Sequence, residues 1–180
     1  MIRFEKEEIK RFLLAMDQYL EAPAEMILIG GTAALLAYQA SGRTQDIDTY
    51  NRIEHLQKAY KKAKKVTGIN IPLSRSSVAD GPHDFESRLK NYNELPLKKL
   101  QIKVPEVVDL ILMKIIRGVE HDLETIRDLI QKQSVQSKSL VERFEKEMGH
   151  VIGDQRRIKQ NFLAMLEENY PGLDLDKLLE

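Results

Sequence analysis

Cysteine and tryptophan are absent from this sequence of 180 residues, and glycine is sparse, with nine residues. The lack of cysteine excludes disulfides, thiolate nucleophiles and cysteine-bound zinc. No apolar run approaches the ~20 residues that a membrane-spanning helix needs, and the first ten residues hold no apolar signal core. We therefore expect a cytoplasmic protein that has no membrane partner.

An excess of one charge sign is also lacking, because 28 Lys and Arg residues balance 28 Asp and Glu residues. This balance excludes a field of one sign over the whole protein, so a nucleic-acid partner would have to meet a local patch. Basic runs at residues 58–65, 97–103 and 156–159 could contact the phosphates of an RNA acceptor. The alternative for each run is a solvated helix face or an edge strand guarded by lysine.

The hydrophobic pattern predicts an N-terminal α/β part followed by a helical part. Helices are expected over residues 4–20, 32–40, 53–66, 106–118, 121–133, 139–148 and 154–169. Strands are expected within residues 25–31, 46–50, 85–92 and 98–104. Pro105 suits the first turn of the helix that follows it. We therefore expect two domains, an α/β domain over residues 1–104 and a helical domain over residues 105–180.

A glycine pair follows the first predicted strand. Gly30 and Gly31 have no Cβ, so their backbone N–H groups can approach a triphosphate closely. The helix after them turns its positive N-terminus towards that anion. Thr32 is placed to cap this helix or to hydrogen-bond a phosphate oxygen. Alone, such a pair is often only a tight turn.

Two carboxylates stand one residue apart in the next predicted strand. Alternate strand residues share a face, so Asp46 and Asp48 project together while Ile47 points into the core. Two like charges so close repel each other unless a cation lies between them. Mg²⁺ prefers oxygen ligands from one or two carboxylates, completed by water and substrate phosphates. Together with the glycine pair, the two acids indicate a site for nucleotidyl transfer that uses Mg²⁺ or Mn²⁺.

The stretch "LIGGTAALLAYQASGRTQDID" (residues 28–48) resembles the signature of the DNA polymerase beta-like nucleotidyltransferase superfamily: an apolar strand, a glycine pair, a helix, then Asp-x-Asp. Thr44, two residues before Asp46, is similar to the form found in AbiEii-type toxin nucleotidyltransferases and their short bacterial relatives. The resemblance implies a nucleotidyltransferase-like mixed sheet with flanking helices, an α/β (α+β) fold, followed by a helical C-terminal lobe that completes an NTP-binding cleft.

A second stretch, "PEVVDLILMKIIRGVEHDLETIRDL" (residues 105–129), resembles the segment of that group in which a helical Lys precedes an Asp that opens the next helix. These residues would be Lys114 and Asp122, with Arg117 between them. A lysine inside "LILMKII" needs an anionic partner or a route to solvent. The alternatives are a phosphate clamp and a row of salt bridges, and both stay open.

The resemblance assigns roles residue by residue. It implies substrate contacts for Gly30, Gly31, Thr32, Thr44 and Arg117, metal ligation by Asp46 and Asp48, and catalytic roles for Asp46, Asp48, Lys114 and Asp122. Catalytically complete members usually add a third carboxylate from a later strand. Here the apolar-X-apolar segment "INI" holds Asn70 instead, and Asp84 and Glu86 are the other candidates.

The sequence thus predicts Mg²⁺-dependent transfer of an NMP from an NTP to a hydroxyl of an RNA, such as tRNA, or of a protein. The toxin resemblance implies a cognate antitoxin or toxin as a partner. Two alternatives remain. One is a catalytically degenerate member that binds nucleotide or acts as an antitoxin; the other is a protein-interaction module whose glycines are structural.

Overall fold

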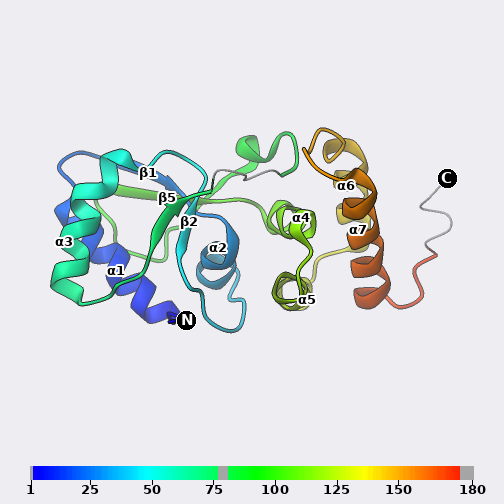
Figure 1. Ribbon diagram of the computed structural model, residues 1–180, viewed down its shortest axis with the longest axis horizontal. Helices are drawn as coiled ribbons and strands as arrows, with labels where there is room; N and C mark the ends of the chain where they lie inside the picture. Colours follow the sequence, from blue (N-terminus) through cyan, green and yellow to red (C-terminus); the bar gives the residue numbers. More distant parts are fainter. Residues whose placement is uncertain (1, 77–80, 175–180) are drawn as a thin grey trace. The chain divides into compact units, whose positions relative to one another are not determined.

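The computed structural model describes residues 2–76 and 81–174. It combines short β-sheets with helices and ends in a helical part, which confirms the mixed α/β class expected from the sequence (Figure 1). Its compact units are residues 2–76 with 89–105, the first unit, and residues 81–88 with 106–174, the second unit. The domain boundary after residue 104 stays a prediction. Within the described ranges, no helix is both long and apolar enough to cross a membrane.

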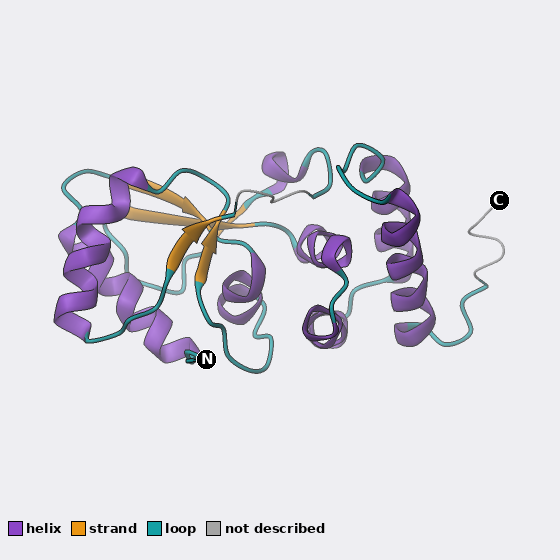
Figure 2. Ribbon diagram, in the orientation of Figure 1, coloured by secondary structure: helices purple, strands orange, loops and turns teal. Residues whose placement is uncertain are grey.

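The first unit is built on two short sheets (Figure 2). In one sheet, β1 (Ala24–Ile27) lies parallel to β5 (Leu100–Val104), and β5 pairs antiparallel with β4 (Lys90–Asn91). In the other sheet, β2 (Ile47–Thr49) lies parallel to β3 (Leu73–Arg75). The strands are thus short and mixed in direction.

A pair of contacts joins the two sheets. Leu28, directly after β1, forms an antiparallel bridge with Thr49 of β2. The backbone N–H of Tyr50 also donates to the carbonyl of Ile27, at 2.9 Å. The end of β1 therefore runs beside β2, and whatever follows β1 must lie next to the side chains of β2.

Three helices of the first unit pack around these strands (Figure 1). They are α1 (Lys6–Tyr19), α2 (Gly30–Ala37) and α3 (Gln57–Thr67), the last preceded by the single turn η1 (Glu54–Leu56). The Phe12 ring of α1 meets the Tyr60 ring of α3 edge to face, with centroids 5.7 Å apart. α2 consists of Gly, Ala, Leu and Thr, and five of its eight residues are buried, so its first turn is held firmly by the core.

A buried carboxylate ties α1 to β5. Asp17 is only 5% exposed, and its oxygens accept the backbone N–H groups of Lys98, Lys99 and Leu100 at 2.7 to 3.1 Å. Burial alone would raise the pKa of Asp17, but these hydrogen bonds and the charge of Lys99 hold the pKa below its ordinary value. The ionised form of Asp17 therefore stabilises the folded chain.

We predict that Asp17→Asn lowers the free energy of unfolding at neutral pH by about 2 kcal/mol, because an amide cannot accept all of these charge-assisted bonds. A depressed carboxyl pKa contributes stability above the ordinary carboxyl pKa, and this contribution is lost as the pH falls through the folded-state value. The difference from wild type should therefore shrink on acidification. Urea unfolding between neutral and acidic pH measures it, with the exposed Glu54→Gln as control; a difference independent of pH would contradict the assignment.

The second unit is helical. It contains η2 (Phe85–Arg88), α4 (Val107–Arg117), α5 (Glu120–Gln133), α6 (Ser137–Glu147) and α7 (Gln155–Asn169). Gly118 ends α4 with φ +58°, in the left-handed region that favours glycine. The chain then turns directly into α5.

Ion pairs hold η2 against α4 and α6. The Arg88 guanidinium donates to both oxygens of Asp109, which is fully buried, and to both oxygens of Glu147. Arg143 donates to Asp109 as well, at 3.1 Å, and to Glu106 at 3.0 Å. Burying the Asp109 carboxylate without partners would cost free energy of folding. The pairing with Arg88 therefore holds η2 in the second unit.

This network corrects one expected strand. Residues 85–88, predicted as part of a strand over 85–92, form a 3-10 turn in the second unit, and only Lys90–Asn91 form a strand. The pairing of Arg88 with Asp109 and Glu147 overrides the alternating pattern that suggested a strand. Pro105 likewise lies before the N-cap residue Glu106, outside the first turn of α4.

Candidate functional site

The glycine pair and the two acids meet in the first unit. The N–H of Ile29 donates to the carbonyl of Asp48 at 3.0 Å, which fixes the start of α2 beside β2. Gly30 opens α2 with φ +63°, and a Cβ built on it would lie 3.1 Å from Oδ2 of Asp48. The Asp48 carboxylate therefore lies against the first turn of the helix, where only glycine leaves space for it.

Two threonine hydroxyls hold Asp46 in place. Oγ1 of Thr32 donates to the Asp46 carbonyl at 2.6 Å, and Oγ1 of Thr44 donates to the same oxygen at 3.1 Å. Both threonines are buried. A Cβ on Gly31 would lie 3.0 Å from Oγ1 of Thr44, so this second glycine allows the close approach of the Thr44 loop.

Thr32 does not cap α2, contrary to one of its two expected roles. The N-cap residue is Ile29, and α2 begins at Gly30, two residues earlier than predicted. The first N–H groups of the helix, which have no partner within an α-helix, thus belong to the glycine pair. They add the positive end of the helix dipole at the Asp48 side of the site.

The two acids are less buried than the residues of β2 beside them. Ile47 and Thr49 are fully buried, whereas Asp46 and Asp48 are half-buried. β2 begins at Ile47, one residue later than expected, so Asp48 lies on the less buried face of the strand and Asp46 lies directly before the strand. The Ser74 hydroxyl of β3, in register with Asp48, donates to Oδ1 of Asp48 at 3.0 Å. The Ser74 hydroxyl is therefore a third side-chain oxygen group at the site, beside the two carboxylates.

The oxygen atoms at this site fit a divalent metal that takes its remaining ligands from water and substrate. Two carboxylates and a hydroxyl are oxygen ligands, as Mg²⁺ requires. In the part of the chain that the structure describes, no three His, Cys, Asp or Glu residues lie close enough together to hold a metal ion by themselves. The set therefore suits a Mg²⁺ ion whose coordination is completed by water and by the phosphates of a nucleotide.

The strand next to β2 is not formed by the segment "INI" (residues 69–71), where a third acid was sought in the sequence. β3 comprises Leu73–Arg75, so Asn70 precedes it and is exposed. The residue of β3 next to Asp48 is Ser74, which sequence reasoning did not single out. Its signal was the short run "LSR" after Pro72, in a stretch (residues 66–84) whose pattern indicates a mixture of short strand and polar loop without fixing where the strand lies.

Lys114, Arg117 and Asp122 form a second cluster, in the second unit. Nζ of Lys114 lies 3.0 Å from Oδ1 of Asp122, and Arg117 donates from Nε and Nη2 to the two oxygens at 2.6 and 2.8 Å. Asp122 and Lys114 are 1% and 6% exposed at their side chains, whereas Arg117 is 68% exposed. The anionic partner that Lys114 needs inside its apolar helix is therefore Asp122.

This cluster also sets the protonation of Asp122. Burial would raise the pKa of Asp122, but the hydrogen bonds from Arg117 and the charge and hydrogen bond of Lys114 hold the pKa below its ordinary value. The carboxylate stays ionised, and both of its oxygens already accept from the two cations. Asp122 thus holds the exposed guanidinium of Arg117 in a fixed position.

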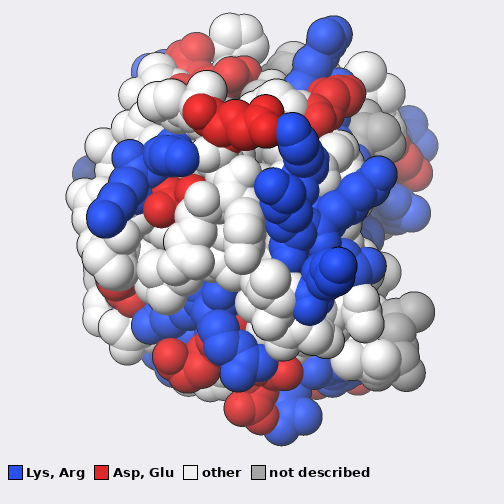
Figure 3. Space-filling view, turned by 90° about the vertical axis from the view of Figure 1, so that its left-hand side faces the viewer, with Lys and Arg blue, Asp and Glu red and all other residues white. Residues whose placement is uncertain are grey.

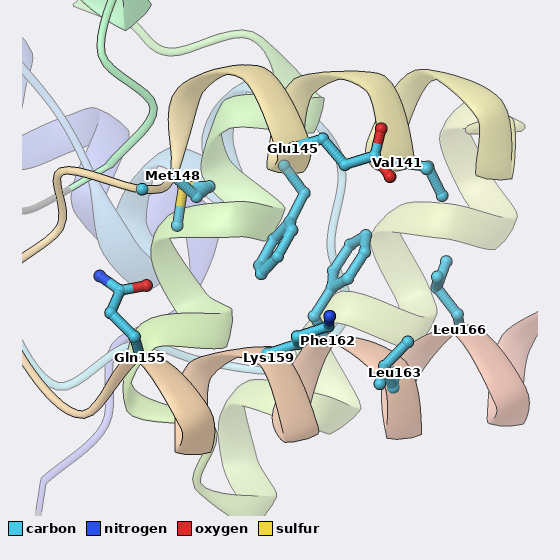
Figure 4. Close-up of a pocket in the computed structure, with 10 residues that line it drawn as sticks. Val141, Glu145, Met148, Gln155, Lys159, Phe162, Leu163 and Leu166 are labelled. Atoms are coloured by element: carbon cyan, nitrogen blue, oxygen red, sulfur yellow. The ribbon is translucent and has the colours of Figure 1, made fainter. Parts of the chain in front are cut away.

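The second unit also holds an apolar hollow of about 270 Å³ between α6 and α7 (Figure 4). The Phe144 and Phe162 rings stack at its side, with centroids 3.9 Å apart. Glu145, Gln155 and Lys159 are the polar and charged residues of its lining. None of the predicted site residues lines it.

Comparison with known proteins agrees with this geometry. Residues 6–169 match the model of a family described as a nucleotidyltransferase of unknown function, DUF6036. The chain belongs to this family of nucleotidyltransferases. It matches no curated protein and no solved structure. The nucleotidyltransferase assignment made from the sequence is thereby confirmed at the level of the family, and a transferase is the expected enzyme class.

We predict that Gly30→Ala lowers the free energy of unfolding by about 1 to 2 kcal/mol, because an L-residue is strained at this positive φ. Its methyl group should also displace the Asp48 carboxylate. Gly68→Ala is the matched control, since Gly68 has a similar φ of +69° but no atom within 4 Å of its added Cβ. If both variants lose the same stability and bind Mg²⁺-NTP alike, the close contact with Asp48 has no functional importance.

We predict that Lys114→Met lowers the free energy of unfolding by about 3 kcal/mol, because it leaves the buried Asp122 charge with one cation fewer. Adding Asp122→Asn should recover part of this loss, since no buried charge then remains. Urea unfolding of wild type, both single variants and the double variant gives the coupling energy. Strictly additive losses would contradict a buried ion pair.

Proposed function

We propose that this protein transfers an NMP from an NTP to a hydroxyl group of an RNA, such as a tRNA 3′ end, or of a protein, with Mg²⁺ or Mn²⁺ as cofactor. The observation behind the proposal is the contact between the N-terminus of α2 and the Asp48 carboxylate, in a chain of the nucleotidyltransferase family. An anion-binding helix start and a pair of metal-binding acids are what a nucleoside triphosphate requires.

In the proposed reaction, the acceptor oxygen forms a bond to the α-phosphorus of the NTP. The bond from that phosphorus to the bridging oxygen breaks, and pyrophosphate leaves with the electron pair. The acceptor hydroxyl proton passes to a base or to water. The chemistry is therefore mainly the positioning of phosphates and the compensation of negative charge.

The residues of the first unit divide these tasks. The N–H groups of Gly30 and Gly31 would bind the triphosphate at the positive end of α2. Asp46 and Asp48 would hold the metal, which when bound neutralises phosphate charge and polarises the α-phosphorus. Thr32 and Thr44, which the sequence suggested as substrate contacts, act through Asp46, because their hydroxyls donate to its carbonyl.

For the second unit, we keep the roles that the sequence resemblance implies. Arg117, exposed and held by Asp122, is the member of its cluster best placed to meet an anion. Lys114 and Arg117 would offset the charge that develops on pyrophosphate. Because both oxygens of Asp122 accept from these cations, orienting Lys114 and Arg117 suits Asp122 better than deprotonating the acceptor.

A second candidate function is nucleotide binding without transfer. The observation that favours it is the hydroxyl of Ser74 in the register position next to Asp48, where a carboxylate would complete a two-metal site. Such a protein could serve as a sensor or as the antitoxin of a toxin partner. In either case, the resemblance to toxin nucleotidyltransferases favours a cognate toxin or antitoxin as the partner. The family match makes a protein-interaction module without a nucleotide site the less favoured alternative.

We predict that Asp46→Asn and Asp48→Asn each change the free energy of unfolding of the ligand-free protein by less than about 1 kcal/mol, because the relief of repulsion between neighbouring carboxylates is offset at Asp48 by the lost interaction with the helix dipole. Each change also removes a formal charge from the proposed metal site. The thermal shift that Mg²⁺-NTP gives to wild type should therefore disappear; ligand at ~100 times its Kd adds ~2.7 kcal/mol.

Thermal denaturation with and without Mg²⁺, for each of the four NTPs, makes this measurement. Glu54→Gln is the control, because Glu54 is an exposed acid of the same unit. Wild type without any Mg²⁺-dependent shift would refute nucleotide binding. Destabilised ligand-free variants would instead show that the two acids serve the fold.

A further inference from the structure

One face of α3 presents a row of lysines, called here the lysine stripe. Its members lie at positions i, i+3, i+4 and i+7 of the helix and are all exposed; they are Lys58, Lys61, Lys62 and Lys65. Ala59 and Ala63 form the buried face. Figure 3, which views the first unit from the side where α3 lies in Figure 1, shows Lys and Arg side chains gathered together on this surface.

The charge of the lysine stripe is compensated at one end only, where Lys62 lies over the Tyr19 ring at 5.5 Å from its centroid. α3 contains no acidic residue, whereas α1, α5 and α6 each carry a Lys–acid pair one turn apart. Lys58 pairs with Glu21, and Lys61 and Lys65 have no ion pair with any residue in the described ranges. Like charges at i, i+4 destabilise a helix, so α3 bears a repulsion that a bound polyanion would relieve.

Two hollows lie at the ends of the stripe. The one beside Lys58 has a volume of about 230 Å³ and is lined by Tyr19, His55 and Glu21, the acid that pairs with Lys58. The one at the other end has a volume of about 390 Å³ and is lined by Arg11 and by Val66, which is 57% exposed. Lysines that track a backbone beside aromatic and apolar surface are the combination that single-stranded nucleic acids bind.

The spacing of these features favours a long polyanion. The seven steps from Lys58 to Lys65 rise about 10 Å along the helix, which is about three phosphates of one strand. The hollow beside Lys58 is also lined by Ala24, the first residue of β1, whereas Gly30 follows the end of β1. β1 alone, from Ala24 to Ile27, rises roughly 10 Å at ~3.3 Å per residue, and residues 28 and 29 add to this separation. A macromolecule reaches both, and a small acceptor does not.

We infer that the lysine stripe binds the phosphate backbone of an RNA acceptor, away from the site of transfer. This inference rests on the proposed function, and it names the acceptor class as RNA rather than protein. Phosphate contacts by lysine position a nucleic acid without reading its sequence. The stripe therefore contributes affinity and orientation, and it leaves the nucleotide site unchanged.

The test compares two double variants with wild type. Lys61→Gln/Lys65→Gln removes two lysines of the stripe, and Lys138→Gln/Lys146→Gln removes two exposed lysines of α6 that lie outside every basic run named above. Binding of fluorescein-labelled bulk tRNA is measured by anisotropy over a range of salt concentrations. The stripe variant should lose about tenfold in affinity, and its salt slope should fall by about 1.4, because each phosphate neutralised on a single strand contributes ~0.7. The control should stay within about twofold of wild type.

Equal losses in the two double variants, or no loss in the stripe variant, would overturn the inference. So would stripe-dependent binding to phosphatidylserine vesicles without binding to tRNA. Thermal shift by Mg²⁺-NTP is recorded on the same samples and should be the same in all three. A wild type that binds tRNA through the stripe but shows no nucleotide shift would contradict the proposed function and leave the RNA surface standing.

Discussion

The candidate site depends on one backbone arrangement, the antiparallel run of residues 27–29 beside residues 48–50. The bonds from Ile29 N–H to the Asp48 carbonyl and from Tyr50 N–H to the Ile27 carbonyl fix it. Since β1 ends there and α2 begins, these bonds bring the helix N-terminus to Asp48 of β2. Without them, the glycine pair at the start of α2 and the two acids would be separate features of the sequence.

Buried charge organises the rest of the chain in the same manner. Asp17, Asp109 and Asp122 are each almost fully buried, and each is met by several donors. These contacts connect segments that are distant in the sequence, such as α1 with β5 and η2 with α4. Many of the acids and bases in this chain of balanced charge therefore pair with each other inside the fold. Against this background, Lys61 and Lys65 of α3 stand out, because they have no ion pair among the described residues.

Periodicity and glycine spacing were enough to predict the mixed α/β class, the main helices and the stretch that contains the glycine pair and the two acids. These features are local, so the sequence displays them directly. The 3-10 turn at residues 85–88 could not be predicted, because the long-range ion pairs of Arg88 decide it. Ser74 was missed for a similar reason, since its place beside Asp48 depends on strand register. Lys114 was predicted to need an anion, and orienting Lys114 was one of two roles suggested for Asp122; the structure places the two side chains 3.0 Å apart.

The central claim is that the α-phosphate of an NTP is transferred to an acceptor, and label position tests it most directly. Wild-type protein is incubated with Mg²⁺, bulk RNA and an NTP labelled with ³²P at either the α or the γ position. The account predicts that α label enters RNA or protein while γ label is released in pyrophosphate. Transfer of γ label would indicate phosphoryl transfer instead, and binding of nucleotide without transfer of either label would contradict the claim.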